Sequence, residues 1–444
     1  MQPSSPKGLN RRAALAATTA ATLTPAIFAA TAKPAMLGGT KIRTAPWPKW
    51  PVFGSEEEEA LTKVLKSAVW NRSSGKTVGK WEDAYAKLTG AKACLATANG
   101  TSALLTSLSA LGVGAGDEVI VPPYTFVATI NVVLALHAIP VFVDTDRQSL
   151  QIDAKKIEAR ITDRTVAIMP VHMGGAPADL DTIIALGKKR NIPVIEDACQ
   201  AHLAEWRGKK VGTYGLTGNF SFQASKNLNS GEGGAILCND PDFIEKCYAY
   251  HNNSRGRLAN GYNFQYASRG NNLRMTEFQG AILSAQMARL EAQTKVRQDN
   301  AAYLSKQLSR IPGISPQKLY PGCTGNAWHL FMMRYDPQKF AGLPRAKFLK
   351  ALGAEGIPAS AGYSPLNKEP LLINTLHSRG YSRLLSRDQL AKWEHANECP
   401  ENDKLCQEAV WFTQNMLLTD RASMDQIVEA IARIQASAPD LART

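Results

Sequence analysis

Apolar and polar residues alternate along the chain in blocks that predict strands and helices in turn. Nearly continuous apolar runs, such as KACLATAN (92–99), DEVIVPPYT (117–125) and IPVIEDA (192–198), indicate buried strands. Stretches that predict helices, such as DAKKIEARI (153–161), separate them. This alternation predicts an α/β fold with a parallel sheet that helices cover on both faces. In such sheets ligands bind at the carboxyl ends of the strands, so the residues that follow each strand are the candidates for chemistry.

A second, smaller domain is predicted after the main series of strands. Helical spacing begins at about Gly280 and continues up to Pro312. Beyond that point strand and helix patterns recur in AWHLFMMRYD, RAKFLKALGAEGIPAS and SMDQIVEAIARIQAS. We therefore expect a large domain over residues 42–290, with the mainly parallel sheet, and a small C-terminal α/β domain over residues 291–444.

The first 32 residues (1–32) differ in composition from the rest and resemble an export signal. Arg11 and Arg12 precede a weakly apolar Ala/Thr stretch that ends in Ala-Thr-Ala at 30–32. The arginine pair is similar to that of twin-arginine signals, and Pro25 and several threonines make the stretch a poor membrane span. We expect export to the periplasm with no stable membrane span. The alternative is a disordered Ala-rich tail on a cytoplasmic protein.

Composition and charge narrow the class of protein. The 444 residues are 44% hydrophobic and 20% charged, as in soluble globular proteins, and the formal net charge is +13. Lys and Arg are scattered, so we expect no nucleic-acid partner and only an affinity for phosphorylated small molecules. The seven cysteines form no CxxC pair and no metal-type group with histidine, so no metal is expected. Whether Cys399 and Cys406 form a disulfide stays open.

Two strand ends carry groups that suit a flat, phosphorylated ligand. ANGTSAL places Gly100, Thr101 and Ser102 at the start of a helix, where free amides and hydroxyls can bind a phosphate. Taken alone, this motif is more simply a capped helix. PPYTFVAT places Tyr124 and Phe126 where a strand becomes a helix, and an aromatic ring there either stacks on a flat ligand or packs in the core.

Two further strand ends supply a carboxylate and an amine. VIEDACQAHLA places Asp197 at the end of a buried strand, with Gln200 three residues on; the carboxylate needs either a protonated ring nitrogen or the amides of a helix that it caps. NFSFQASKNLNSGEGGA sets Lys226 among glycines and hydroxyls, with Ser221 and Ser225 available to bind a phosphate. An amine framed in this way can form a Schiff base.

A phosphate site, a flat aromatic ring, a carboxylate for a pyridinium and an amine for an aldehyde together fit pyridoxal phosphate. Each motif is weak alone, and their order and spacing favour this cofactor. A nicotinamide dehydrogenase is set aside, because no GxGxxG follows a strand and GEGG lacks the spacing.

The chain resembles the DegT/DnrJ/StrS-type aminotransferases, which are sugar and cyclitol aminotransferases of the fold-type I pyridoxal phosphate enzymes. The resemblance covers roughly residue 42 to the C-terminus and rests on NGTSAL, PPYTFVAT, VIEDACQAH, FSFQASKNLNSGEGGA and RGNNLRMTEFQGA. It implies that Lys226 and Asp197 are the catalytic residues, as the Schiff-base lysine and the partner of the pyridinium. The cofactor-binding residues that it implies are Gly100, Thr101, Ser102, Phe126, Asp197, Gln200, Ser221, Lys226 and Asn272.

The resemblance also implies an assembly and a reaction. Asn272 is in the position that reaches the phosphate of the neighbouring subunit, so a homodimer is expected. The implied reaction is a transamination from glutamine or glutamate to a keto-sugar or keto-cyclitol. AEGIPASAGYSPL and LRMTEFQGAILSAQ are more similar to the cyclitol branch, with acceptors of the scyllo-inosose type. Tyr363, His329 and Arg255 are candidates for substrate contact and could equally be structural.

Two alternatives to transamination are left open. One is a pyridoxal phosphate-dependent dehydration of a sugar; some relatives that dehydrate have histidine in place of the lysine, and Lys226 argues against this. The other is a non-catalytic sugar-binding relative that kept the fold. The export-like leader is a departure from the family, whose members are typically cytoplasmic, and an exported enzyme would meet few nucleotide sugars.

Overall fold

The computed structural model describes residues 32–258, 261–263, 266 and 268–443. The predicted export signal lies outside this part, apart from its last residue, Ala32. None of the helices in the described part is long and apolar enough to cross a membrane.

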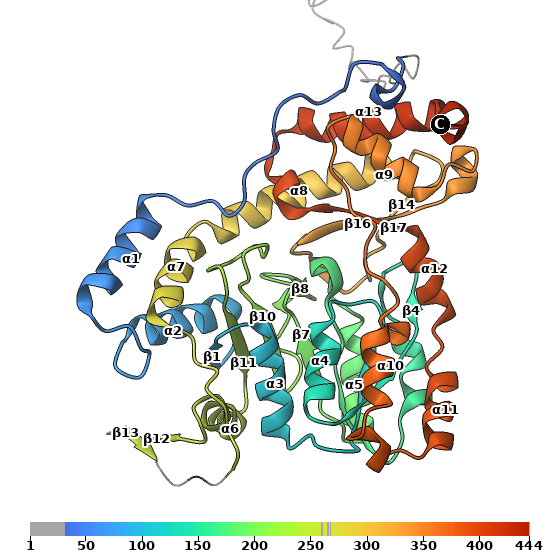
Figure 1. The fold of residues 1–444 in the computed structure, drawn as a ribbon. Coiled ribbons are helices and arrows are strands. Elements are labelled where there is room, and N and C mark those ends of the chain that lie inside the picture. Colours follow the sequence, from blue (N-terminus) through green and yellow to red (C-terminus); the bar gives the residue numbers. More distant parts are fainter. Residues whose placement is uncertain (1–31, 259–260, 264–265, 267, 444) are drawn as a thin grey trace, which may run out of the picture.

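A mainly parallel sheet forms the centre of the large domain (Figure 1). Its strands are β1 (Ala93–Thr97), β2 (Glu118–Val121), β3 (Ile139–Phe142), β6 (Thr165–Ile168), β7 (Ile195–Asp197), β10 (Thr217–Ser221) and β11 (Gly234–Cys238). Hydrogen bonds order them as β1-β11-β10-β7 and β3-β2-β6, and a parallel bridge from Val171 to Asp197 joins the two groups. The pairs that include β11 are antiparallel and the others are parallel, which confirms the predicted fold class.

Helices cover both faces of this sheet. The helices of the described chain, in both domains, are α1 (Ser55–Ser67), α2 (Thr77–Thr89), α3 (Gly100–Leu111), α4 (Ala128–Ala135), α5 (Leu180–Arg190), α6 (Pro241–His251), α7 (Glu277–Met287), α8 (Leu290–Leu308), α9 (Arg345–Ala354), α10 (Pro370–Leu376), α11 (Arg387–Ala396), α12 (Pro400–Glu408), α13 (Arg421–Ala436) and α14 (Ala438–Arg443). Val119 and Val121 of β2 pack with α3, α4, α10 and α11, whereas Ile120 packs with α5. Alternate side chains of a strand point to opposite faces, so both faces are buried.

The small domain is built on a three-stranded antiparallel sheet, β14-β16-β17, against α8, α9 and α13. These strands are β14 (Ile314–Pro316), β16 (Leu330–Tyr335) and β17 (Ala409–Thr413). The remaining short strands are β4 (Thr145–Asp146), β5 (Gln151–Ile152), β8 (Glu205–Trp206), β9 (Lys209–Lys210), β12 (Gly256–Leu258), β13 (Gly261–Asn263) and β15 (Cys323–Gly325). Between β16 and β17 the chain returns to the large sheet, where the Trp393 indole N–H of α11 donates to the carbonyl of Pro140 over 2.9 Å.

Two predicted helices differ from what is observed. The long helix expected from Gly280 is two helices, α7 and α8, and the break lies where the Arg289 side chain turns to bind the carbonyl of Val52. The helix expected over residues 153–161 is two short 3₁₀ turns, because Asp153 caps only the first turn and the backbone is extended again at Ile161.

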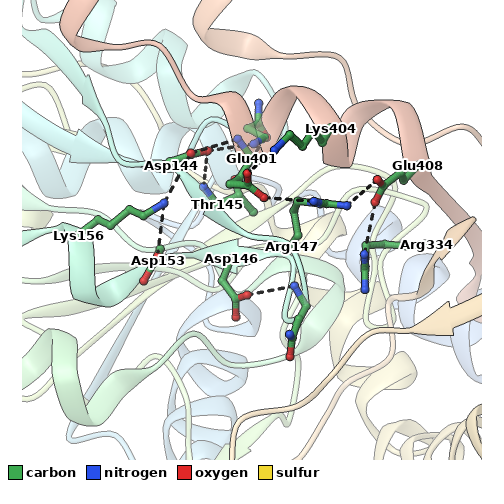
Figure 2. Close-up of polar contacts among 12 residues, drawn as sticks. Asp144, Thr145, Asp146, Arg147, Asp153, Lys156, Arg334, Glu401, Lys404 and Glu408 are labelled. Carbon is green, nitrogen blue, oxygen red and sulfur yellow. Dashed lines mark hydrogen bonds and ion pairs between the residues drawn. The ribbon is translucent and has the colours of Figure 1, made fainter. Parts of the chain in front are cut away.

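Helix α12 is fixed to the large domain by charged side chains (Figure 2). Asp144, just before β4, accepts hydrogen bonds from two backbone amides in the first turn of α12, at 3.1 and 2.9 Å. Arg147 pairs with Glu401 at 3.2 Å and with Glu408 at 2.6 Å, and Glu408 also pairs with Arg334 of β16 at 3.4 Å. Because α12 leads directly into β17, these contacts set where β17 meets the large domain.

All seven cysteines are free thiols. Cys399 and Cys406, whose pairing the sequence left open, are both buried and are not bonded to each other. Burial raises the pKa of each to about 12, so both are neutral thiols at ordinary pH.

A buried carboxylate, Glu196, organises the loop beside β7. It accepts hydrogen bonds from the amides of Gly212, Tyr214 and Gly215 at 2.7 to 2.8 Å and contacts His172 Nε2 at 3.0 Å. The amide of Ala178 donates to His172 Nδ1, so Nε2 is the ring nitrogen that donates to Glu196. Burial raises the pKa of Glu196, but these donors outweigh it and hold the pKa below its ordinary value.

Replacing Glu196 with Gln is expected to lower the free energy of unfolding by about 3 kcal/mol or more, because Gln cannot accept all four bonds. In the wild type, a carboxyl with a lowered folded pKa stabilises the fold above its unfolded pKa, and this contribution is lost as pH falls through the folded pKa. Glu196→Gln should therefore show a weaker loss of stability in acid. Urea denaturation at several pH values measures both effects.

The control is Glu158→Gln, since the Glu158 carboxylate accepts from Lys189 and Arg190 at the surface, where an ion pair adds little stability. If Glu196→Gln and the wild type had the same free energy of unfolding at neutral pH, the stabilising role of the Glu196 carboxylate would be wrong.

Candidate active site

A cavity of about 670 Å³ lies at the carboxyl ends of the parallel strands, as the fold class predicts. Its lining comes from the ends of five strands and from the small domain. The large domain contributes Asn99, Gly100, Thr101, Leu104, Thr125, Phe126, Ala128, Thr129, Val171, Asp197, Cys199, Gln200, Ser221, Gln223, Ser225, Lys226 and Glu232. The C-terminal part contributes His329, Leu330, Tyr363 and Trp411.

One part of the cavity is suited to an anion. Helix α3 begins at Gly100, and Asn99 caps it by accepting from the amide of Ser102 at 2.8 Å. A Cβ on Gly100 would lie 2.6 Å from the Cβ of Ser221, so only glycine lets the helix end approach β10 this closely. Free amides, the helix dipole and the hydroxyls of Thr101 and Ser221 can bind a phosphate there. Ser102 itself is buried and is not part of the lining.

Asp197 is a buried carboxylate, and each of its two oxygens accepts a hydrogen bond. Thr129 Oγ1 donates to Asp197 Oδ2 at 2.8 Å, and the amide of Cys199 donates to Oδ1 at 3.2 Å. Thr129 is in turn 2.9 Å from the hydroxyl of Thr125. No helix follows Asp197 in the described chain until Pro241, so the alternative of a helix cap is wrong. The carboxylate borders the cavity and can receive a protonated ring nitrogen.

Phe126 supplies the flat surface that the sequence led us to expect at the end of β2. Its side chain is 56% exposed and lines the cavity, whereas neighbouring Tyr124 is buried and packs in the core. A large exposed aromatic ring inside a cavity, rather than at the surface, is available for stacking on a planar ligand. Of the two interpretations of PPYTFVAT, stacking therefore suits Phe126 and core packing suits Tyr124.

Lys226 lies in the loop between β10 and β11 and lines the same cavity. Burial lowers the pKa of its amine below the ordinary value, and the nearby carboxylate of Asp197 only partly opposes this. No ion pair joins Lys226 to Asp197 or to another carboxylate in the part of the chain that the structure describes. The amine is therefore more readily neutral, as a nucleophile or base must be.

The remaining wall is aromatic and largely uncharged. Gln200 Oε1 accepts from the amide of Gly174 at 2.8 Å, and its Nε2 donates to the hydroxyl of Tyr363 at 3.2 Å. Burial raises the pKa of Tyr363 to about 12, and the Tyr363 ring packs edge to face with Trp411 at 4.8 Å. Burial, followed by the charge of Lys226, lowers the pKa of His329 well below its ordinary value, so this ring is neutral.

Sequence reasoning missed two residues of this site. Thr129 holds Asp197, and the only signal was a pair of threonines four apart in TFVAT, which the start of a helix places on one side. Trp411 lies on β17, more than 200 residues from Asp197, and no local pattern marks it.

Besides Ser102, two more predicted residues are not part of this cavity. Asn272 pairs with Asn252 in an isolated bridge, and Arg255 Nε donates to the carbonyl of Asn252 at 3.2 Å. Both belong to the segment that includes β12 and β13, outside the lining. The other substrate candidates, Tyr363 and His329, do line the cavity.

Comparisons with known proteins identify the family of this chain. The model of the DegT/DnrJ/EryC1/StrS aminotransferase family matches residues 51–432. The chain is 37% identical to an L-glutamine:2-deoxy-scyllo-inosose aminotransferase of Streptomyces lividus over 352 residues, which are 76% of this chain and 82% of that protein. It is 35% identical to a protein of the same name from Micromonospora echinospora, over 92% of this chain and 99% of that one.

Solved structures of similar fold lead to the same family. The structure of 3-amino-5-hydroxybenzoic acid synthase superposes with a TM-score of 0.79 at 30% identity, over 89% of this chain and 99% of that one. DesV of S. venezuelae gives a TM-score of 0.73 at 28% identity, over 85% and 94% of the two chains. The family match spans both domains and all the strand ends that form the cavity. The chain therefore belongs to the DegT/DnrJ/EryC1/StrS aminotransferase family and is an aminotransferase.

Proposed function

We propose that this aminotransferase binds pyridoxal phosphate at Lys226 and transfers an amino group from glutamine or glutamate to the ketone of a cyclitol or sugar. The observation that carries the proposal is the cavity itself. It brings together the Lys226 amine, whose pKa is lowered, the buried Asp197 carboxylate and the anion-binding start of α3. When bound, the cofactor supplies a ring that takes up the electron pair of the carbon that loses its proton.

Different residues of the chain would bind the phosphate, hold the ring and move the proton. The start of α3, with Thr101 and Ser221, would hold the phosphate. Asp197 would keep the ring nitrogen protonated, and Phe126 would hold the ring flat. The Lys226 amine, which is easily neutral, would act as the base that takes the proton from the substrate carbon.

A cyclitol is the acceptor that the aromatic wall of the cavity favours. Tyr363, Trp411 and Leu330 present aromatic and apolar surface, on which the C–H face of a polyol ring can pack. In the described chain this wall holds no cation for a nucleotide diphosphate, since His329 is neutral. The names of the relatives, L-glutamine:2-deoxy-scyllo-inosose aminotransferases, add support for glutamine as donor and a scyllo-inosose-like ketone as acceptor.

We also propose a homodimer in which each site takes residues from both chains. Asn272 and Arg255 lie outside the cavity of their own chain. In a dimer they could instead reach the phosphate and the substrate in the cavity of the partner chain. Phe53, Leu65 and Trp70, on and beside α1, are 71%, 57% and 50% exposed, which is unusual for large apolar side chains and suits an interface. An isologous dimer is the commonest closed assembly.

Purified protein is expected to show the visible absorbance of lysine-bound pyridoxal phosphate. Glutamine should remove this absorbance and a ketocyclitol should restore it, with release of the aminocyclitol seen by mass spectrometry. Lys226→Ala should fold but show neither the absorbance nor turnover. Lys210→Ala is the matched control, because Lys210 pairs with Glu205 away from the cavity. A sugar dehydration product, or binding of sugars with no turnover, would favour the alternatives instead.

Asp197→Asn is expected to lower the transamination rate by about 10²- to 10³-fold, the usual effect of removing a preorganised charge from an active site. Thr129→Val should lower the rate by about five- to tenfold, because it removes one hydrogen bond from Asp197 and leaves the carboxylate in place. Single-turnover kinetics with glutamine measures both variants. Turnover of Asp197→Asn within a factor of a few of the wild type would reject the pyridinium role.

Mixing the two inactive homodimers tests the shared site. Lys226→Ala chains and Asn272→Ala chains should form hybrid dimers in which one site keeps both native residues, so activity should return that neither parent shows. Light scattering before and after mixing establishes that the chains are dimers and that they exchange. Absence of recovered activity despite exchange, or a fully active monomer, would disprove shared sites.

A further inference from the structure

The N-terminal segment, residues 43–53, connects the small domain with the large one. Figure 1 shows it in blue, passing from beside α13 down to α1. In the small domain, the Trp47 indole N–H donates to the carbonyl of Gly356 at 2.9 Å. In the large domain, the carbonyl of Val52 accepts from Gln286 Nε2 at 2.7 Å, at the end of α7.

Between these two contacts the segment reaches the proposed Schiff-base lysine. The Trp50 indole N–H donates to the backbone carbonyl of Lys226 at 3.2 Å. The same carbonyl accepts from Asn229 Nδ2 at 3.3 Å, and the Lys226 amide donates to the carbonyl of Gln223 at 2.8 Å. Of these three bonds, the one from Trp50 comes from a distant part of the sequence and the other two from the lysine's own loop.

Arg297 of α8 lies against the Trp50 ring, with its Cζ 5.3 Å from the ring centroid. The arginine is 0% exposed, and its Nε and Nη2 donate to Gln414 Oε1 at 2.9 and 2.6 Å. Among the described residues no carboxylate pairs with it, and Nη1 has no hydrogen-bond partner. Burial lowers the pKa of Arg297 to about 9. A buried cation without a counter-ion does not stabilise a fold, so another role must explain it.

We propose that Trp50 is a positioning residue for Lys226, and that Arg297 and Gln414 fix the Trp50 ring for this purpose. The contacts form one continuous series from Gln414, which follows β17, through Arg297 and Trp50 to the backbone of Lys226. The strand that carries Trp411, which lines the cavity, is thereby connected to the loop that carries Lys226.

The chemistry of the lysine explains why such a support is useful. The amine must move between the cofactor and the substrate carbon while its backbone stays in place, since small displacements of a reacting group lower rates strongly. An aliphatic side chain in place of Arg297 would fill the core at no desolvation cost, but it would hold the indole without the cation–π attraction and without the bond to Gln414.

The test compares two tryptophans of the same segment. Trp50→Phe and Trp47→Phe each remove one indole N–H bond to a backbone carbonyl, and each tryptophan ring lies against an arginine. In Trp50→Phe we expect kcat per bound cofactor to fall about five- to tenfold with KM unchanged, the effect of one hydrogen bond at the reacting group. Hydrogen exchange of residues 222–231 should become faster. Trp47→Phe should change neither quantity, whatever its effect on stability.

A second pair of variants separates positioning from stability. Arg297→Met should leave the melting temperature unchanged or raise it, because the buried charge is gone, and should still lower kcat per bound cofactor. Arg297→Lys keeps a charge but loses the planar group, and should lower kcat in the same way.

This inference rests on the proposed role of Lys226, and one measurement distinguishes the two. Borohydride reduction of the wild-type holoenzyme, followed by peptide mass spectrometry, should place the cofactor on Lys226; failure here rejects the proposed function. If the cofactor is on Lys226 but Trp50→Phe keeps the kcat of the wild type, or Trp47→Phe loses as much as Trp50→Phe, the positioning role is wrong. A loss of activity in Arg297→Met that only follows a loss of stability would also overturn it.

Discussion

The structure depends on keeping one amine and one carboxylate in the same cavity without letting them pair. A salt bridge between Lys226 and Asp197 would keep the lysine charged and occupy the carboxylate, so neither would be free to act. Thr129 and the amide of Cys199 already hold the two oxygens of Asp197, and burial favours the neutral form of the amine. Each group is thus satisfied by its own surroundings, and the space between them is available to a ligand.

The parallel sheet positions the other residues of the site, because it brings residues that are far apart in sequence to one edge. The anion-binding start of α3 at Gly100, the ring of Phe126 and the carboxylate of Asp197 each lie at the end of a different strand. The small domain then closes the cavity with Tyr363 and Trp411, and its position is set by contacts to the large domain at α12 and along the N-terminal segment.

The parts of the site that sequence could predict are those that sit at strand ends. Asp197 and Lys226 were predicted because their short motifs combine a strand pattern with polar and glycine residues next to it. Such motifs can be recognised without knowledge of the fold. Trp411 and Arg297 could not be predicted, because their significance comes from packing across the domains and not from adjacent residues. The helix expected over 153–161 failed for a related reason: local propensity is weak, and here the chain turns after each short segment.

The N-terminal segment has a consequence for how the protein is made. Arg43 donates to Ser423 Oγ and to Gln426 Oε1, and these residues are 380 and 383 positions away in sequence. During synthesis the segment leaves the ribosome long before its partners on α13. The large domain can collapse around its sheet while translation continues, and Val52 can already bind α7, but the Arg43 end of the segment cannot dock until α13 has been made. The cavity, which also needs Trp411 of β17, therefore becomes complete only late in synthesis, however early its central strands form.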